Sequence, residues 1–563
     1  MTSTTQPPSS GTPGTPGASG SLGRQVSRAM AWNTLTAPLK TAVELATNLI
    51  ILNVLTLPQF GVLRLVTSAA ATLGIWVDLG IDRALPRFIP ELQQERGQAA
   101  VRRFMQIIFL VKALLLTLMS GLFLLFSERF VAFLLDGVAQ LPERIDAAAQ
   151  LALTNEMLRL APLMVGAVLA LVILGSLYDG LMAYLVSYFR QRAWNLITIM
   201  GDIVQPTLTA VLVLAGYGIG GVLVAIVATP VLSVLVAGWQ VLSSLGSAPT
   251  PAASTAAPAP PEDAPANNTL WRRFAVYTGM SNVLNLSDYF LSWLFAVFLL
   301  TNPVQVAIFS VGSALVRQTL ALLYRPLVGI QVPLFTRVRG GDAPLPDAYA
   351  AVLRILALIM LPGGVGLVLL ANELILVQYP QYVAATLVIA ILTPALFFES
   401  FLSSAQIILQ VYERYGLLIL SRLAALPVIV VMVGMWLTGV RVGLLEAALL
   451  VGGGRILMGL TAALLAQRAF GLRYSWAFFG RVGLAALVMA GVVWGLRQVP
   501  WLASIGTGVT ERLLAAGVLL AVIAVGAVSF VLVFRLLGGL DADDRIWIAE
   551  NKVPLGRWLL RML

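Results

Sequence analysis

The sequence predicts an all-α polytopic membrane protein with about fourteen transmembrane helices. Of its 563 residues, 59% are hydrophobic and only 11% are charged, and the mean hydropathy is +0.90. A soluble domain carries about a quarter charged residues, so this chain cannot cover a surface that faces water. The apolar residues also fall in runs of about 20, the length with which a helix crosses about 30 Å of hydrocarbon. The alternating pattern typical of an outer-membrane barrel is not present.

The apolar runs set the order of the chain and its division into domains. We place the spans at roughly 32–56, 60–79, 104–126, 158–178, 195–215, 219–243, 276–300, 305–325, 351–371, 386–408, 416–437, 443–466, 482–497 and 513–536. A Pro/Ala-rich segment follows the sixth span and cannot build a core. The predicted domains are a disordered tail (1–23), an N-lobe of six spans (24–243), a linker (244–270), a C-lobe of six spans (271–466), two further spans (467–540) and an amphipathic tail (541–563).

The two six-span halves resemble each other, which indicates a duplicated unit. Three signatures recur in the same order: the turns Thr56–Pro58 and Thr301–Pro303, the loops Pro90-x5-Arg96-Gly97 and Pro333-x5-Arg339-Gly340, and the prolines Pro206 and Pro427. Because six is an even number of spans, both halves would enter the membrane from the same side. The sequence therefore predicts a parallel repeat about an axis along the membrane normal.

Basic residues are distributed unequally between the two sides of the predicted spans. The loops on the side of the N-terminus, with Arg414 and Arg422 counted among them, hold roughly four times as many basic residues as the opposite loops. This bias predicts that both termini are cytoplasmic. It also accounts for the formal net charge of +10 without a nucleic-acid partner.

The chain contains no Cys and no His. This excludes a thiol nucleophile, a disulfide, a Cys/His zinc site and a His proton relay. The glycine-rich stretch Gly363–Gly366 lies within a span and lacks the Lys-Ser/Thr of a phosphate-binding loop. We therefore expect no cofactor, no metal and no ATP-driven pump. Ion coupling would fall to carboxylates, Lys, Arg or Tyr.

Polar residues lie on one face of the first predicted span. Lys40, Glu44 and Asn48 follow one another at four-residue intervals, which places them on the same side of a helix. An ionised side chain at the membrane centre costs about 2.5–3.5 kcal/mol on insertion scales, so two in one helix need a reason. One interpretation is a neutralised Lys40–Glu44 pair that holds helices together. The other is that this face lines a water-filled cavity.

Polar faces on other spans favour the cavity. The candidates are Arg64 and Asp78 in the second span, Asn282, Asn285 and Asp288 in the seventh, Arg317 in the eighth, Glu399 in the tenth and Arg455 in the twelfth. Most lie on the first two spans of a lobe, and these positions are equivalent in the repeat. The orientation of two arginines stays open. Arg64 lies near the predicted outer boundary, where it can snorkel. Arg455 follows Gly452–Gly454, a motif as typical of close packing as of a hinge.

The stretch LPQFGVLRLVTSAAATLGIWVDLGIDRALPRFIPELQ, Leu57 to Gln93, carries a resemblance to a known family. With Pro-x-Phe-Gly (Pro58–Gly61), the Gly80–Pro90 stretch and Arg325–Pro326, it resembles the O-antigen and exopolysaccharide (Wzx-type) flippases of the multidrug/oligosaccharidyl-lipid/polysaccharide (MOP) superfamily. The resemblance spans residues 25–545. It implies the fold of MATE exporters and MurJ, with the helices equivalent to spans 1, 2, 7 and 8 around a central cavity.

The resemblance leaves three functions to compare. The first is translocation of an undecaprenyl diphosphate-linked oligosaccharide from the cytoplasmic to the outer leaflet by alternating access, in a bacterial or archaeal cytoplasmic membrane. The second is cation-coupled multidrug antiport on the same fold, and the third is a membrane enzyme. A diphosphate needs cations in the cavity, which Lys40 and Arg317 supply. Cationic drugs need an acidic, aromatic cavity instead. The longest outer loop, 127–150, is too short for a catalytic domain, which disfavours the enzyme. The characteristic motifs of a lipid II flippase are not seen either, so the first function is favoured.

The sequence also indicates which residues could couple transport to an ion gradient and which partners the protein would contact. Glu44 and Asp288 lie on repeat-equivalent helices and are the candidates for coupling to H⁺ or Na⁺. If both are simply salt-bridged, their role is structural. The Trp- and Arg-containing end of the amphipathic tail predicts contact with anionic lipids. We expect a monomer that can associate with proteins of polysaccharide polymerisation and export.

Overall fold

The computed structural model describes residue 47 and residues 50–141, 147–187, 191–246, 267–341, 344–498 and 509–540. Its first half contains α2 (Leu57–Asp78), α3 (Ile81–Leu125), α4 (Ser127–Ala139), α5 (Ala147–Ser187), α6 (Gln191–Leu212), the π-helical turn η1 (Val213–Tyr217) and α7 (Gly218–Gly246). Its second half contains α8 (Asn267–Phe290), α9 (Trp293–Ala296), η2 (Val297–Leu299), α10 (Pro303–Arg339), α11 (Leu345–Leu369), α12 (Ala371–Gln378), η3 (Pro380–Tyr382), α13 (Ala385–Val411), α14 (Tyr415–Leu423), α15 (Leu426–Thr438), α16 (Leu444–Phe470), α17 (Trp476–Arg497) and α18 (Val509–Leu536). All of these elements are helical.

The helices confirm a polytopic membrane protein. Nine stretches in the described part are long and apolar enough to cross a membrane, or up to eleven if each of two bent helix pairs is one span. Two of the nine, Leu57–Leu125 and Ala193–Ser243, each contain two predicted spans. Thirteen predicted spans therefore coincide with helices, and most of span 32–56 lies outside the described residues.

The exposed surface of these helices suits hydrocarbon. On α3, Leu110, Leu114 and Leu118 follow one another at one-turn intervals, and each is more than half exposed. Such a stripe would be costly in water and is favourable against lipid tails.

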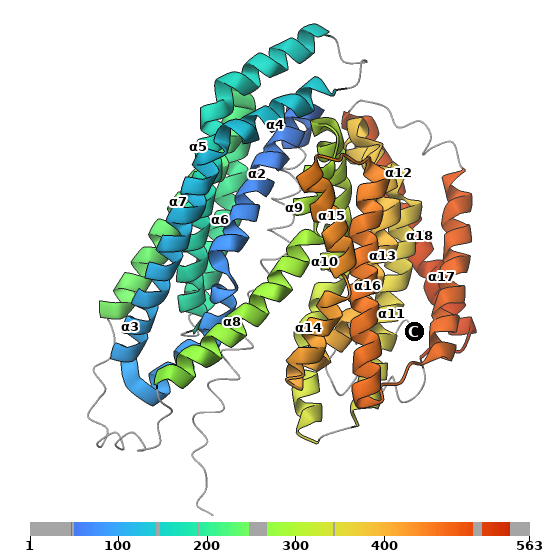
Figure 1. The fold of residues 1–563 in the computed structure, drawn as a ribbon. Coiled ribbons are helices and arrows are strands. Elements are labelled where there is room, and N and C mark those ends of the chain that lie inside the picture. The colour runs from blue at the N-terminus through green and yellow to red at the C-terminus, as the bar shows by residue number, and fades with distance from the viewer. Residues whose placement is uncertain are drawn as a thin grey trace, which may run out of the picture.

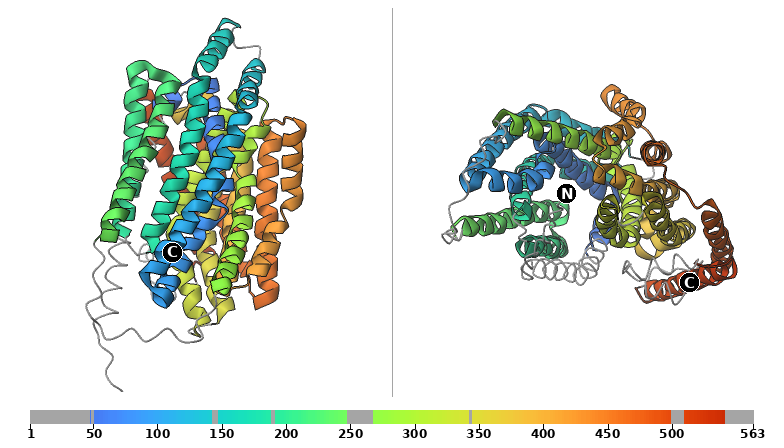
Figure 2. Two further views of the ribbon diagram at one scale, coloured as in Figure 1. Left: turned by 60° about the vertical axis from the view of Figure 1, so that its left-hand side comes forward. Right: turned by 90° about the horizontal axis from the view of Figure 1, so that it is seen from below.

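The helices form two groups joined by one oblique helix. Figure 1 shows α2 to α7 on the left and α10 to α16 on the right, with α17 and α18 at the far edge; the view from below in Figure 2 shows the same separation. α8 runs from the foot of α3 towards the middle of the right-hand group. Its first half packs on α3, where Phe274 contacts Phe88 and Phe104 and Arg273 pairs with Glu91 at 2.7 Å.

The two repeated turns both begin helices. Thr56 caps α2 in a capping box: its hydroxyl accepts from the Gln59 amide at 3.4 Å, and the Gln59 side chain accepts from the Thr56 amide at 3.1 Å. Asn302 caps α10 and accepts from the Gln305 amide at 3.0 Å. The turns thus serve the same purpose, but the capping residue differs by one position between the halves.

These two turns lie against each other. A Cβ on Gly61 would lie 2.5 Å from the carbonyl carbon of Pro303 and 2.9 Å from its Cα, which is closer than atoms pack. A Cβ on Gly137 of α4 would meet the ring of the same proline at 3.3 Å, and Asn302 donates to the Gln140 carbonyl at 3.4 Å. The starts of α2 and α10, which belong to different helix groups, are therefore in direct contact.

The corner between α2 and α3 packs on α8. Leu79 and Gly80 both have positive φ, 47° and 79°, and turn the chain between the two helices. A Cβ on Gly80 would lie 2.7 Å from the Thr278 carbonyl oxygen and 2.8 Å from the Asn282 amide nitrogen. Glycine is required here both for the left-handed backbone and for the close approach.

Candidate functional site

The predicted site residues fall into four sets in the structure. Lys40, Glu44 and Asn48 lie outside the described residues. Asp78, Asn285 and Asp288 line a cavity; Arg64 and Arg317 gather around an aromatic residue; and Glu399 and Arg455 belong to an ion-pair network that also includes Asp288. Asn282 lies on α8 beside the α2–α3 corner, and its side-chain oxygen is buried with no hydrogen-bond partner among the described residues.

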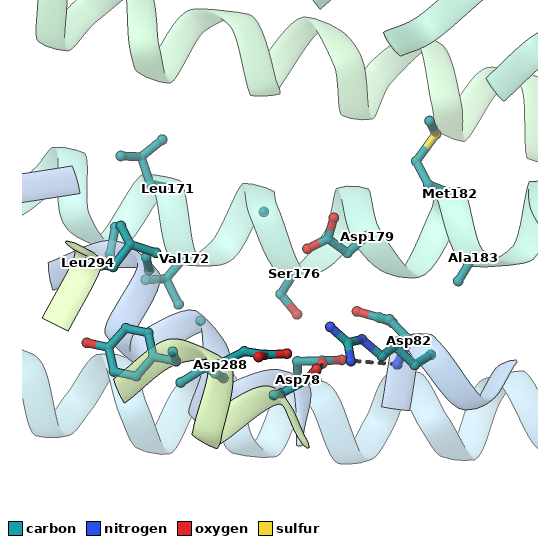
Figure 3. A pocket seen from close by; sticks show the side chains of 18 of the residues that line it. Asp78, Asp82, Leu171, Val172, Ser176, Asp179, Met182, Ala183, Asp288 and Leu294 are labelled. Atoms are coloured by element: carbon teal, nitrogen blue, oxygen red, sulfur yellow. Dashed lines mark hydrogen bonds between the residues drawn. The ribbon is translucent and has the colours of Figure 1, made fainter. Parts of the chain in front are cut away.

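A cavity of about 900 Å³ lies between the left-hand helices and α8. Four carboxylates line it: Asp78, Asp82, Asp179 and Asp288. Figure 3 shows Asp78 and Asp288 close together, facing Ser176 and Asp179 of α5. Trp194 and Tyr289 add aromatic rings, and the one lining residue that is basic is Arg83. This acidic cavity was not predicted from the sequence.

Asp78 holds the corner at the end of α2. Its carboxylate accepts from the Gly80 amide at 3.1 Å, from the Asp82 amide at 3.0 Å and from the Asn285 side chain at 3.4 Å. Two of these bonds satisfy amides at the start of α3, which have no partner within the helix. Asp78 therefore has a structural role in addition to its place in the cavity wall.

Lys112 of α3 is a buried cation that the sequence analysis missed. Its side chain is 3% exposed, it pairs with Asp82 at 2.7 Å, and it donates to the Ser176 carbonyl at 3.2 Å. Asp179, one turn after Ser176, has no salt-bridge partner in the described part of the chain. A lone Lys within the predicted span 104–126 was the available signal, since ionisable residues inside a membrane span indicate function or pairing.

We expect Lys112→Met to destabilise the protein by about 3–5 kcal/mol, because removing one partner leaves the Asp82 carboxylate buried and unpaired. Adding Asp82→Asn should recover most of the loss. Thermal unfolding of the two single variants and the double variant in detergent measures this. Arg273→Met, which breaks the exposed pair with Glu91, is the matched control and should cost about 0–1 kcal/mol. Additive losses in the double variant would contradict the pairing.

Arg64 and Arg317 both lie against the Trp293 ring. The guanidinium carbons are 5.6 Å and 5.0 Å from the indole centroid, and Arg64 also lies 4.6 Å from the Phe60 ring. Arg317 donates to the Ser313 hydroxyl at 3.3 Å, and the Nε of Arg64 is buried without a hydrogen-bond partner among the described residues. Neither arginine has a carboxylate partner in the described part of the chain. Arg64 therefore does more than snorkel to the interface.

Asp288 is held by two arginines. Arg422 approaches one carboxylate oxygen at 2.7 Å and Arg455 approaches the same oxygen at 3.2 Å. Arg455 also lies 3.7 Å from Glu399, and Arg422 donates to Gln406 at 3.0 Å. The prediction that Arg422 belongs to a cytoplasmic loop is wrong: the residue is 8% exposed on α14 and faces α8. These salt bridges favour a structural role for Asp288 over the role in ion coupling that the sequence also allowed.

The comparisons with known proteins identify the fold. No protein-family model and no curated protein matches the sequence. The structure is similar to the lipid II flippase MurJ in an inward closed conformation, with a TM-score of 0.57 and 11% identity over 87% of this chain and 98% of that chain.

Two other solved structures are similar at lower TM-scores. The MATE transporter ClbM in complex with Rb⁺ gives 0.46 at 15% identity over 80% of this chain and 95% of that one. A MOP superfamily transporter from Pyrococcus furiosus Vc1 gives 0.39 at 13% identity over 79% and 95%. The likeness to MurJ confirms the predicted MurJ-like fold. The protein is therefore a multi-pass membrane protein with a MurJ-like fold, and its function has to be argued from its own residues.

Proposed function

We propose that the protein is a flippase that moves a lipid diphosphate-linked oligosaccharide between the leaflets of the membrane by alternating access. The observation that carries this proposal is the pair of arginines around Trp293. Two guanidinium groups share a partly buried site, and neither has a carboxylate counter-ion among the described residues. Burying cations without a partner is costly, and an anionic ligand would offset that cost.

A diphosphate suits this pair of arginines. Each planar guanidinium can donate two parallel hydrogen bonds to phosphate oxygens, and the Trp293 ring attracts both cations through cation–π interactions. Thr67, one turn after Arg64, lines the cavity, so a headgroup at the arginines could extend its glycan into that space. Lys40 is a third candidate cation.

Reconstituted protein provides the direct test. The proteoliposomes contain a fluorescent undecaprenyl diphosphate-linked oligosaccharide, and an impermeant lectin or quencher detects the molecules that reach the outer leaflet. Label from the inner leaflet should become accessible faster than in vesicles without the protein. The same lipid with a neutral headgroup should not be moved. Equal movement of both lipids would contradict recognition of the diphosphate.

Cation-coupled antiport is a second candidate because of the acidic cavity. Four carboxylates and two aromatic residues line it, and such a lining favours cationic compounds. Tetraphenylphosphonium is a suitable probe: an antiporter should bind it competitively with protons, and Asp179→Asn should abolish its binding. A flippase for anionic headgroups should bind farnesyl diphosphate instead and should lose that binding on removal of Arg317.

If transport is coupled to H⁺ or Na⁺, we infer that Asp179 is the best-placed carboxylate in the described part of the chain. Asp288 is held by two arginines, Asp82 by Lys112 and Asp78 by backbone amides, whereas Asp179 faces the cavity without a salt bridge. We expect Asp179→Asn to lower gradient-driven transport to the rate measured without a gradient. Asp288→Asn should lower both rates alike.

Transport in proteoliposomes with an imposed proton or sodium gradient measures this, and Glu44→Gln should be tested beside the two aspartate variants. A wild type that ignores both gradients, or an Asp179→Asn variant that still responds, would contradict the inference.

A further inference from the structure

The helix that carries Trp293 is broken directly before this residue. α8 ends at Phe290, α9 begins at Trp293, and the two axes differ by 54°. A helix end leaves its last carbonyls without partners within the helix. Inside a membrane such groups are costly unless other parts of the protein supply donors. The partners of the Asp288 and Leu291 carbonyls therefore decide how the break is stabilised.

Arg455 of α16 supplies those donors. Its Nε donates to the Leu291 carbonyl at 2.9 Å, its Nη2 donates to the Asp288 carbonyl at 3.0 Å, and its Nη1 contacts the Asp288 carboxylate at 3.2 Å. One guanidinium thus holds two backbone groups and one side chain at the break. Arg422 of α14 holds the same carboxylate oxygen at 2.7 Å.

The glycines before Arg455 let α16 approach the break. A Cβ on Gly454 would overlap the Leu291 side chain, with 3.3 Å to Cδ1 and 3.4 Å to Cγ. A Cβ on Gly452 would lie 3.0 Å from the Ala395 methyl, whereas Gly453 has open space. Gly452–Gly454 is therefore a close-packing motif, and it places Arg455 where it reaches the carbonyls.

Beyond the break, the chain restarts with a cap. The Ser292 hydroxyl accepts from the Leu294 amide at 3.2 Å and donates to the Tyr289 carbonyl at 2.6 Å. Trp293 is the first residue of α9, and its ring contacts both Arg64 and Arg317. The direction of the break therefore sets the position of the indole.

We infer that Arg455 and Gly454 are positioning residues that fix the α8–α9 break, and through it Trp293, in the arginine site. The inference rests on the proposed function, because it assigns these residues to the diphosphate site. In the described part of the chain, no hydrogen bond or ion pair joins Arg455 to Arg64, Arg317 or Trp293; its partners are Leu291, Asp288 and Glu399. Arg455 acts indirectly: it holds the Asp288 and Leu291 carbonyls, and these fix the course of the chain that carries the Trp293 ring.

The test follows Trp293 by ¹⁹F NMR in protein labelled with 5-fluorotryptophan, the resonance being assigned with Trp293→Phe. Arg455→Lys keeps a positive charge beside Asp288 but loses the fixed fork of donors. Gly454→Ala keeps every charge but places a methyl group against the buried Leu291 side chain at the break. In both variants we expect the Trp293 resonance to shift without ligand, and the affinity for farnesyl diphosphate to fall about tenfold. Arg354→Lys, an arginine of α11 with similar burial, should leave both unchanged.

The outcomes separate the inference from the proposed function. If farnesyl diphosphate does not shift the wild-type Trp293 resonance more than farnesol does, the proposed diphosphate site is wrong. If the wild type responds but the resonance and affinity of both variants match the wild type, the positioning role is overturned and the proposed function stands. Should Arg455→Lys fail to fold, Gly454→Ala gives the same readout with the charge network intact.

Discussion

Replacing Arg64 and Arg317 together by leucine is expected to abolish translocation of the lipid-linked oligosaccharide while leaving folded protein in the membrane. A hydrogen bond to a charged group contributes about 1.5–3 kcal/mol, so each guanidinium lost should weaken diphosphate binding by about ten- to a hundredfold. The two cations have no carboxylate partner among the described residues. Their removal should therefore leave the melting temperature unchanged or raise it, unlike the removal of one partner from a buried ion pair.

The flip assay in proteoliposomes and thermal unfolding in detergent measure the two effects side by side. Arg129→Leu is the matched control, because Arg129 also stacks on an aromatic ring, Phe126 at 5.3 Å, but is exposed and does not line the cavity. It should transport as the wild type does. A double variant that transports normally would contradict the diphosphate site, and one that unfolds would mean that the arginines are structural.

Much of the fold could be predicted because one property dominates the sequence. Runs of apolar residues must become helices in a membrane, where backbone groups need internal partners. The helix starts at Thr56 and at the Thr301–Pro303 turn also follow from local chemistry, since capping side chains and proline act on neighbouring residues. The oblique course of α8 does not follow from such signals, because it depends on aromatic contacts with α3, far away in the sequence.

The candidate site was predicted less completely because charges meet across distant segments. The spacing of polar residues placed Asp288 and Arg455 on polar faces, but it could not show that they pair. Arg422 was assigned to a loop because it lies near the start of a span, where basic residues are common; its contact with Asp288 is 134 residues away in sequence. Lys112 likewise meets Asp82 across the α3 kink. A single sequence therefore shows which charged residues lie inside spans, but the ion pairs that they form depend on how the helices pack.

Gly61→Ala is expected to separate the starts of α2 and α10 and to slow translocation. The added methyl group would overlap the backbone of Pro303, which cannot rotate away as a side chain could. Overpacking of this kind costs about 1–3 kcal/mol. It would disfavour the state described here, in which the two turns touch, by about five- to 150-fold relative to a state in which they are apart. An alternating-access cycle needs both states, so a shift in either direction slows it.

The chain has no native cysteine, so spin labels can be placed cleanly on Leu57→Cys and Val304→Cys at the two helix starts. The distance distribution between them should move to longer values in Gly61→Ala, and the flip rate should fall about tenfold. Gly121→Ala is the matched control, since a Cβ at that position of α3 meets nothing within 4 Å. The idea fails if Gly61→Ala keeps both the parental distances and the parental rate, because the contact between the turns would then not take part in the cycle.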